Sequence, residues 1–253
     1  MVGIYFSGTG NTKHCMKQFI KKYDESASVI SIEDSSAIQV IKDNDLIVFA
    51  YPVYYSNLPK IVRDFIEDNK KLFGDKKIYI IATMGLFSGD GAGCAARIFR
   101  KYDAEVIGGL HLKMPDCIGD VKLLKKSLEQ NKRVVTDAEK KINKAVKDLK
   151  EGKQKREGIN IIYHIAGLFC QRLWFYNKTK NYTDKLKINQ LKCIGCGICS
   201  NKCPMNNLEI GNGIVKTKGL CTMCYRCVSN CPKQAITLIG KKVYEQCKIE
   251  RYI

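Results

Sequence analysis

The chain has 253 residues, enough for two domains, and 45% of them are hydrophobic, so the sequence can supply a sizeable core. Its 43 lysines and arginines outnumber 25 aspartates and glutamates, which gives a formal net charge of +18. Because the lysines are spread over most of the chain and no nucleic-acid motif accompanies them, we do not expect nucleic acid as a partner.

The N-terminus and the apolar stretches predict where the protein resides. Residues 1–6 run directly into a strand-like stretch and lack the charged start and cleavage site of a secretory signal. We therefore expect a cytoplasmic protein, in which dense cysteine spacing indicates metal or redox chemistry before disulfides. No window offers the roughly 18 uninterrupted apolar residues of a membrane span. The nearest, 159–176, contains polar residues, so we expect a packed connector helix there, with peripheral membrane contact as the alternative.

The first 150 residues alternate between strand-like and helix-like segments. Short runs rich in β-branched residues predict strands at 1–6, 28–32, 45–50, 77–83 and 104–112. Apolar residues three and four apart predict helices at 12–23, 58–68, 91–102 and 121–150. This alternation predicts an α/β fold, a doubly wound parallel sheet covered on both faces. In such sheets a ligand binds beyond the carboxyl ends of the strands, so the loops at those ends form the candidate site.

The first of these loops is Ser7-Gly8-Thr9-Gly10-Asn11-Thr12, between the first strand and the first helix. Glycines let the main chain approach an anion, the helix N-terminus adds free N–H groups and a positive dipole end, and the hydroxyls add donors. The loop therefore predicts a neutral phosphate cradle, with an ordinary helix-capping turn as the alternative. The loop lacks the Gly-Lys-Ser/Thr ending of a P-loop, which argues against nucleoside triphosphate hydrolysis. It also lacks the pattern G-x-G-x-x-G, which argues against binding of a dinucleotide.

This loop resembles the T/S-x-T-G-x-T phosphate-binding signature of flavodoxins, matched by Ser7, Thr9, Gly10 and Thr12. The resemblance covers roughly the first 150 residues and implies an FMN cofactor and a five-stranded parallel sheet in the order 2-1-3-4-5. It also implies that the loops after the third and fourth strands hold the isoalloxazine ring, with Tyr54 or Tyr55 as the expected stacking aromatic and Phe87 as the weaker candidate. The candidate residues in these two loops are Pro52, Val53, Tyr54, Tyr55, Ser56, Asn57, Thr83, Met84, Gly85, Phe87, Ser88 and Gly89.

Eight of the 13 cysteines fall in two equal runs near the C-terminus. The first is Cys193-x2-Cys196-x2-Cys199-x3-Cys203-Pro204, and the second begins 28 residues later at Cys221. Four thiolates can hold an iron–sulfur cubane, and the run resembles the bacterial ferredoxin pattern, in which the fourth cysteine ligates the other cluster. Tetrahedral zinc also uses Cys-x2-Cys pairs. However, neither zinc nor disulfides explain why three cysteines stand at successive spacings of three, why a proline follows the fourth cysteine, and why the whole run is repeated.

The ferredoxin resemblance implies two [4Fe-4S] clusters in a small α+β dicluster domain with crossed ligand sets. One set is Cys193, Cys196, Cys199 and Cys231, and the other is Cys203, Cys221, Cys224 and Cys227. We divide the chain into a flavodoxin-like domain at 1–152, a helical connector at 153–184 and a ferredoxin-like domain at 185–253. Among the other cysteines only Cys94, at a predicted helix start, suggests reactivity, and no histidine has ligand or triad spacing.

The whole chain resembles flavodoxin–ferredoxin fusion proteins of anaerobic bacteria and archaea. The resemblance implies an electron carrier that converts between one-electron and two-electron steps for redox partner proteins, since each cluster passes one electron and FMN holds one or two. The alternative is an FMN-dependent reductase of a small acceptor such as a quinone, a porphyrin or a nitro compound. A redox sensor ranks last, because no effector module is visible. A basic face for an acidic partner stays open, and no oligomeric state is predicted.

Overall fold

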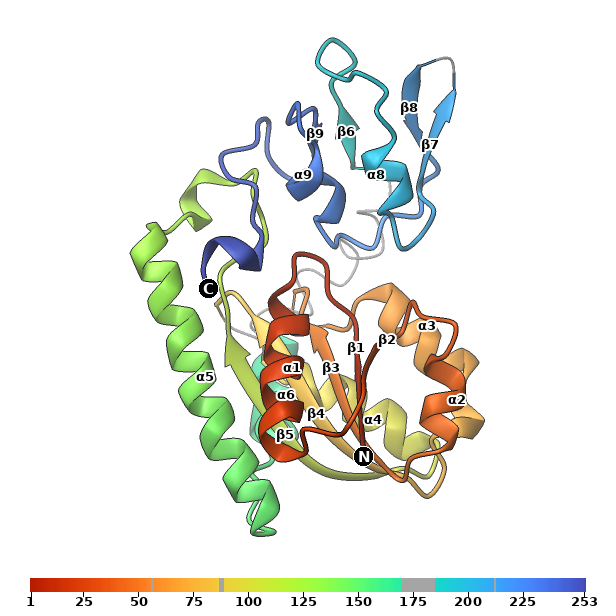
Figure 1. Cartoon of the computed structure of the whole chain (residues 1–253), viewed down its shortest axis with the longest axis vertical. Helices are drawn as coiled ribbons and strands as arrows, with labels where there is room; N and C mark the ends of the chain where they lie inside the picture. Colours follow the sequence, from red (N-terminus) through yellow and green to blue (C-terminus); the bar gives the residue numbers. More distant parts are fainter. Residues whose placement is uncertain (56, 87–88, 170–184, 212) are drawn as a thin grey trace.

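The structure is a computed structural model that describes residues 1–55, 57–86, 89–169, 185–211 and 213–253. Its N-terminal part is a five-stranded parallel sheet in the order β2-β1-β3-β4-β5, as predicted (Figure 1). The strands are β1 (Val2–Tyr5), β2 (Val29–Ser31), β3 (Leu46–Pro52), β4 (Lys77–Met84) and β5 (Glu105–Lys113). Since β1 lies between β2 and β3, the winding direction reverses there, and the loop after β1 stands at the switch point.

Helices join and cover these strands. In this part of the chain they are α1 (Asn11–Tyr23), α2 (Ala37–Lys42), α3 (Lys60–Asp68), α4 (Gly91–Lys101) and α5 (Leu128–Lys150), with 3-10 turns η1 (Lys70–Leu72) and η2 (Lys122–Leu124). The sequence did not predict α2, because six residues are too few to show a helical period. The helix predicted from residue 121 begins at Leu128 instead, because Ser127 and Gln130 form a reciprocal capping box there.

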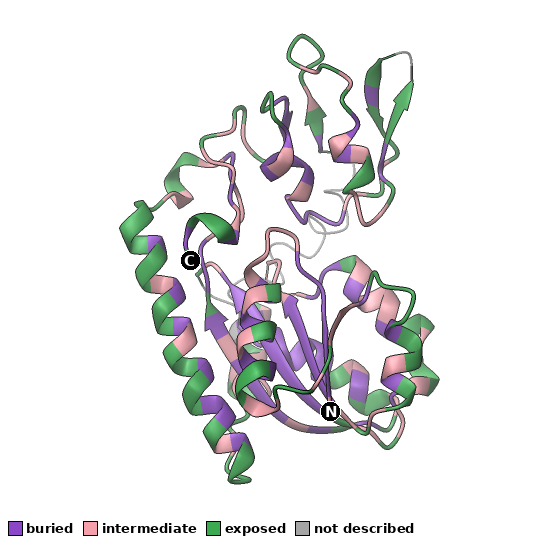
Figure 2. Ribbon diagram, viewed as in Figure 1, coloured by how far each residue is buried: buried purple, intermediate pink, exposed green. Residues whose placement is uncertain are grey.

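Alternate strand residues face opposite sides of the sheet. In β3, Ile47 and Phe49 pack with α3 and α4, whereas Val48 and Ala50 pack with α1 and α5. All four are fully buried, and Figure 2 shows the buried sheet between helices whose outer faces are exposed. The strands are apolar almost throughout because both faces of the sheet are covered.

The C-terminal part contains two small antiparallel sheets and short helices, the small α+β domain that was expected. β6 (Lys187–Ile188) pairs with β9 (Ile236–Thr237), and β7 (Leu208–Gly211) pairs with β8 (Ile214–Thr217). The helices are α8 (Ile198–Asn201) and α9 (Arg226–Asn230), followed by the 3-10 turn η5 (Ile249–Arg251). These elements surround a separate apolar core.

The two parts of the chain pack directly on each other. Tyr54 and Tyr55, from the loop after β3, pack against the core of the C-terminal part. In return, Ile249 and Tyr252, at the end of the chain, are buried in the core between α1 and α5. The C-terminal part therefore sits over the carboxyl edge of the sheet, where Figure 1 shows it above β1 and β3.

The connector contains α6 (Ile161–Gly167), whose first turn is capped by Asn160 Oδ1 accepting the Tyr163 N–H. The predicted helix over 159–176 was expected to be packed, but Ile161 and Ile162 are 67% and 72% exposed. Residues 170–184 lie outside the described residues. Within the described ranges, no helix combines the length and apolar character that crossing a bilayer requires.

Candidate flavin and iron-sulfur sites

The loops after β1, β3 and β4 meet around one cavity of about 210 Å³ at the carboxyl edge of the sheet. Three groups of predicted flavin residues line it: Ser7, Gly8, Thr9, Asn11 and Thr12; Pro52, Val53, Tyr54 and Tyr55; Thr83, Met84 and Gly85. Of the other predicted residues, Gly10, Asn57 and Gly89 do not line this cavity. Ser56, Phe87 and Ser88 lie outside the described residues.

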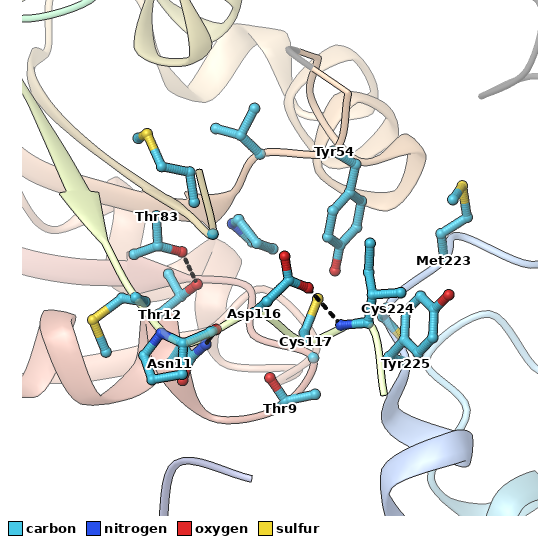
Figure 3. A pocket seen from close by; sticks show the side chains of 18 of the residues that line it. Thr9, Asn11, Thr12, Tyr54, Thr83, Asp116, Cys117, Met223, Cys224 and Tyr225 are labelled. Carbon is cyan, nitrogen blue, oxygen red and sulfur yellow. Dashed lines mark hydrogen bonds between the residues drawn. The ribbon is translucent and has the colours of Figure 1, made fainter. Parts of the chain in front are cut away.

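The first loop is shaped by its glycines and by local hydrogen bonds. Gly10 has a left-handed φ of 98°, and its N–H donates to Ser7 Oγ at 3.2 Å. The hydroxyls of Thr12 and Thr83 are 2.7 Å apart and join the first turn of α1 to the end of β4 (Figure 3). Because α1 carries no acidic residue in its first turn, the positive end of its dipole faces this loop without compensation.

Asn11 gives a direct test of whether an FMN tail fits. Its Nδ2 donates to the Pro115 carbonyl at 2.7 Å, while its buried Oδ1 has no hydrogen-bond partner among the described residues. A buried acceptor without a donor is costly, and a ribityl hydroxyl would satisfy it. The cradle residues Ser7, Gly8, Thr9 and Thr12 suit the phosphate. The residues present therefore fit FMN.

The cavity wall also includes residues that the sequence analysis did not assign to it. They are Leu86, Met114, Pro115, Asp116, Cys117, Ile118, Leu124, Met223, Cys224 and Tyr225. Met114, Pro115 and Asp116 directly follow β5, and this position at the end of the last strand is the sequence signal that could have placed them at the site. Burial raises the pKa of the Asp116 carboxyl, although the Ile118 N–H donates to Oδ1 at 2.7 Å and opposes the shift.

The structure separates the eight motif cysteines into two groups of four. Cys193, Cys196, Cys199 and Cys231 line one cavity, and Cys203, Cys221, Cys224 and Cys227 line another. These are the crossed sets that the ferredoxin resemblance implied. Among the described residues, no three His, Cys, Asp or Glu side chains are grouped closely enough to hold a single metal ion. Each set instead surrounds a space, which fits a cubane held by four separated thiolates.

The electrostatics of the thiols follow the same grouping. Burial raises the pKa of the Cys224 thiol to about 12, with Cys221 and Cys203 adding to the shift. Burial raises the pKa of Cys199 too, and there the contributing neighbours are Cys231 and Cys193. The cysteines that raise the pKa of Cys224 and of Cys199 thus belong in each case to the same set of four, and a positively charged iron core would stabilise these two thiolates.

Two protein families match the two parts of the chain. Residues 3–106 match the model of the flavodoxin domain, and residues 185–232 match that of the 4Fe-4S dicluster domain. The chain is a flavodoxin–ferredoxin fusion. Its flavodoxin domain implies FMN, and its dicluster domain implies iron–sulfur clusters.

The fusion spans a fifth or less of the length of two curated proteins to which it is similar. It is 32% identical to "Putative oxidoreductase UacF" of Escherichia coli (strain K12) over 35% of this chain and 15% of that protein. It is 40% identical to "Uncharacterized protein MJ0749" of Methanocaldococcus jannaschii over 21% of this chain and 20% of that protein. The two-electron reduced flavodoxin of Megasphaera elsdenii has 23% identity and a TM-score of 0.42, covering 57% of this chain and 100% of that chain.

The flavin cavity and one cysteine cavity of the fusion share a wall. Cys224 and Tyr225 line both. In Figure 3 they stand on the side of the pocket opposite Thr12 and Thr83. A Cβ atom on Gly8 would lie 2.1 Å from the Cys224 carbonyl oxygen, so the phosphate loop and the cysteine loop meet backbone to backbone. The flavodoxin loop can approach the ligand loop this closely because residue 8 has no side chain.

Arg226 connects α9 to the flavodoxin domain. Its guanidinium forms two hydrogen bonds of 2.7 Å to Glu33 and donates to the Ser7 carbonyl at 2.8 Å. It also lies 5.9 Å from the centre of the Phe6 ring. This planar, bidentate arrangement holds the loop after β1 beside the cysteine loop. Sequence patterns could not reveal it, because its partners lie about two hundred residues away in the chain.

Asp120 fixes a second contact between the two parts of the fusion. Its buried Oδ2 accepts the backbone N–H groups of Leu238, Ile239 and Gly240 at 2.6–3.0 Å, and its Oδ1 accepts the Tyr225 hydroxyl at 3.0 Å. A carboxylate that accepts several N–H bonds is well compensated for its burial. The segment after β5 therefore anchors the turn after β9 and the residue beside Cys224.

Cys94 and His164 belong to a third polar cluster around Asp90 of the α4 N-terminus. Asp90 is fully buried and pairs with Arg97 at 2.6 Å and with His164 at 2.9 Å, which ties α6 to α4. Burial raises the pKa of the Cys94 thiol despite nearby Arg97. That direction opposes the reactive thiolate considered from the sequence.

Proposed function

We propose that the fusion relays electrons between redox partner proteins through FMN and two [4Fe-4S] clusters held by the two cysteine sets. Bound FMN supplies one-electron and two-electron chemistry, and each cluster supplies one-electron chemistry. The domain limits are proposed at 1–152, 153–184 and 185–253, and the density of motif thiols favours the cytoplasm, where thiols stay reduced.

The observation that carries this proposal is the shared wall at Cys224. We name the set of Cys203, Cys221, Cys224 and Cys227 the proximal set and the other the distal set, because only the proximal set borders the flavin cavity. A ligand thiolate in the wall of the flavin cavity provides a short route between the two centres. Covalent linkage also gives each centre a high effective concentration at the other.

The residues of the chain have separate parts in this relay. Ser7, Gly8, Thr9, Gly10, Asn11 and Thr12 would bind and orient the phosphate and the ribityl chain. The loops at 52–57 and 83–89 would hold the ring, and Tyr54 stays protonated because burial raises the pKa of its hydroxyl well above the usual value. Met223 and Tyr225 line the cavity on the ferredoxin side.

A flash-photolysis experiment tests the relay. A neutral photoreductant generated by light reduces the anaerobic holoprotein, and flavin and cluster absorbance are followed separately. We expect flavin reduction coupled to cluster reoxidation at a rate independent of protein concentration. In Cys224→Ser this coupled phase should fall at least about tenfold or disappear, since the proximal set loses a ligand. Cys15→Ala, at a buried cysteine of α1 outside both sets, should keep it. Equal rates in Cys224→Ser and in the wild type would refute the relay.

A second cavity supports the alternative of a small-molecule reductase. It measures about 370 Å³ and shares Met84 and Leu86 with the flavin cavity, and its polar lining includes His111, Lys113 and Tyr163. An acceptor bound there would lie next to the loop that is expected to hold the ring. Anaerobic turnover with a quinone, without any partner protein, tests this candidate. Turnover slower than the flash-measured transfer by about a hundredfold would favour the carrier.

A further inference from the structure

We propose that the end of the ferredoxin domain farthest from the flavodoxin domain is the docking surface for a one-electron partner protein with an acidic face. The inference deepens the proposed function and rests on it, because it names where the relay exchanges single electrons. We name this region the tip surface. It comprises Leu191, Lys192, Ile194, Cys196, Ile210 and Lys233.

The tip surface is where a cluster ligand reaches solvent. Cys196 is exposed, whereas the other seven motif cysteines are half-buried or buried. It belongs to the distal set, and Ile194 and Lys233 line the cavity of that set. Figure 1 shows the loop between β6 and α8 at the end of the molecule opposite the flavodoxin sheet. Electron transfer falls steeply with distance, so a partner is best placed beside this ligand.

The same surface exposes large apolar side chains. Leu191 is 99% exposed and Ile194 is 60% exposed. Ile210 of the β7–β8 hairpin is exposed as well, and its Cδ1 atom would lie 3.2 Å from a Cβ on Gly197, so the hairpin adjoins this loop. Apolar residues grouped on a surface and flanked by charged ones are typical of protein contact sites.

Charge identifies the chemistry of the partner. Residues 185–253 contain ten lysines and two arginines against three glutamates and no aspartate, a formal charge of +9. Two clusters with their thiolates subtract about 4, which leaves the domain basic. Lys192 and Lys233 are exposed, and among the described residues neither lies in an ion pair, whereas Lys218 pairs with Glu209. Unpaired lysines beside a ligand favour an acidic partner and disfavour a second copy of this chain.

Charge reversal at the tip tests the proposal. The variant Lys192→Glu with Lys233→Glu is compared with Lys17→Glu and Lys132→Glu, two exposed lysines of α1 and α5 that give the same change in net charge. The electron donor is a small acidic [2Fe-2S] ferredoxin, reduced beforehand. We expect the bimolecular rate of flavin reduction at low salt to fall at least about tenfold in the tip variant and less than about twofold in the control. The difference should shrink as salt rises.

The neutral photoreductant separates this proposal from the relay itself. It should reduce the clusters and the flavin at the same rate in all three proteins, with unchanged iron and flavin content. If the ferredoxin fails to reduce the wild type, or if the tip variant matches the wild type at low salt, the docking proposal is wrong. The same holds if both variants slow equally. If the photoreductant shows no cluster-to-flavin transfer in the wild type, the proposed function fails instead.

Discussion

Single residues set the contact between the two redox sites. Gly8 is the clearest case, because a side chain there would occupy the position of the Cys224 carbonyl. Asn11 is another, since its buried Oδ1 lacks a donor among the described residues and points to a ligand. Neither property is visible from a Gly/Ser/Thr-rich loop alone, where glycine is expected merely for backbone freedom.

Gly8→Ala should loosen the contact between the domains. The added methyl group must displace the Cys224 backbone or the phosphate loop, and overpacking of this kind costs about 1–3 kcal/mol. We expect a lower thermal midpoint and a slower flash-measured transfer from cluster to flavin. Gly211→Ala is the matched control, because nothing lies within 4 Å of a Cβ there. Equal transfer rates in the two variants would contradict the close contact.

His111 of β5 gives a prediction about pH. Its Nε2 accepts the Ala92 N–H at 3.2 Å, and burial lowers its pKa to about 4 although Glu157 acts in the opposite direction. The unfolded chain, with a pKa near 6.5, therefore binds the proton more readily than the native state. The contribution to stability is present above about pH 6.5 and is lost as pH falls toward 4.

His111→Gln should flatten this pH dependence. Urea unfolding, monitored by far-UV circular dichroism between pH 7.5 and 5.5, should show the wild type losing more stability on acidification than the variant. The difference in stability between the two proteins should be smaller at pH 5.5 than at pH 7.5, because part of the contribution of neutral His111 has been lost there. If the free energy of unfolding changed equally with pH in the wild type and in the variant, His111 would not be the source of the pH dependence.

At the scale of elements, α9 depends on contacts outside its own domain. It has five residues, too few for a helix that is stable by itself. It carries both Cys227 and Arg226. The Arg226 contacts to Glu33 and Ser7 join it to the ends of β1 and β2. The position of the proximal set thus depends on the flavodoxin sheet as well as on the cysteine motif.

Arg226→Gln should weaken this attachment. The change removes a bidentate, partly buried ion pair, and hydrogen bonds to charged groups contribute about 1.5–3 kcal/mol. We expect a lower thermal midpoint and slower cluster-to-flavin transfer at unchanged iron content. Arg133→Gln serves as the control, because Arg133 and its partner Glu129 are both about three-quarters exposed. If Arg133→Gln lowered the thermal midpoint and the transfer rate as much as Arg226→Gln, the contacts of Arg226 would have no specific role in joining the domains.

At the scale of the whole molecule, the two parts have unequal cores. The flavodoxin sheet is covered on both faces by large apolar clusters, whereas the C-terminal part has one small core that includes several motif cysteines. Small domains with few apolar residues need additional cross-links. Iron–sulfur clusters held by both halves of the motif would supply them, so binding of the clusters and folding of this part should be coupled.

Removal of iron by a chelator under mildly oxidising conditions should expose this coupling. Hydrogen exchange measured by mass spectrometry should show loss of protection across 185–248, while amides of β1, β3, β4 and β5 keep theirs. The C-terminal residues Ile249 and Tyr252 should retain more protection than 185–248, because they belong to the flavodoxin core. Unchanged protection throughout would contradict the coupling.

The sequence by itself determined the features that depend on local patterns. Strand and helix alternation predicted the doubly wound sheet, and the resemblance of the first loop to flavodoxins implied its strand order. Cysteine spacing predicted the dicluster domain, which the family match supports. It missed α2 and began the last long helix of the sheet seven residues early, since short helices and capping boxes show weakly in periodicity.

Only the tertiary structure decided how the two domains meet. Three contacts join residues more than a hundred positions apart: the hydrogen bonds of Arg226, the close approach of Gly8 to Cys224, and the bonds to the buried carboxylate of Asp120. Such contacts depend on where each chain segment lies after folding, and no local pattern encodes that position. The cysteine motif could predict which thiols would share a cluster, but only the folded chain could show that Cys224 lies in the wall of the flavin cavity.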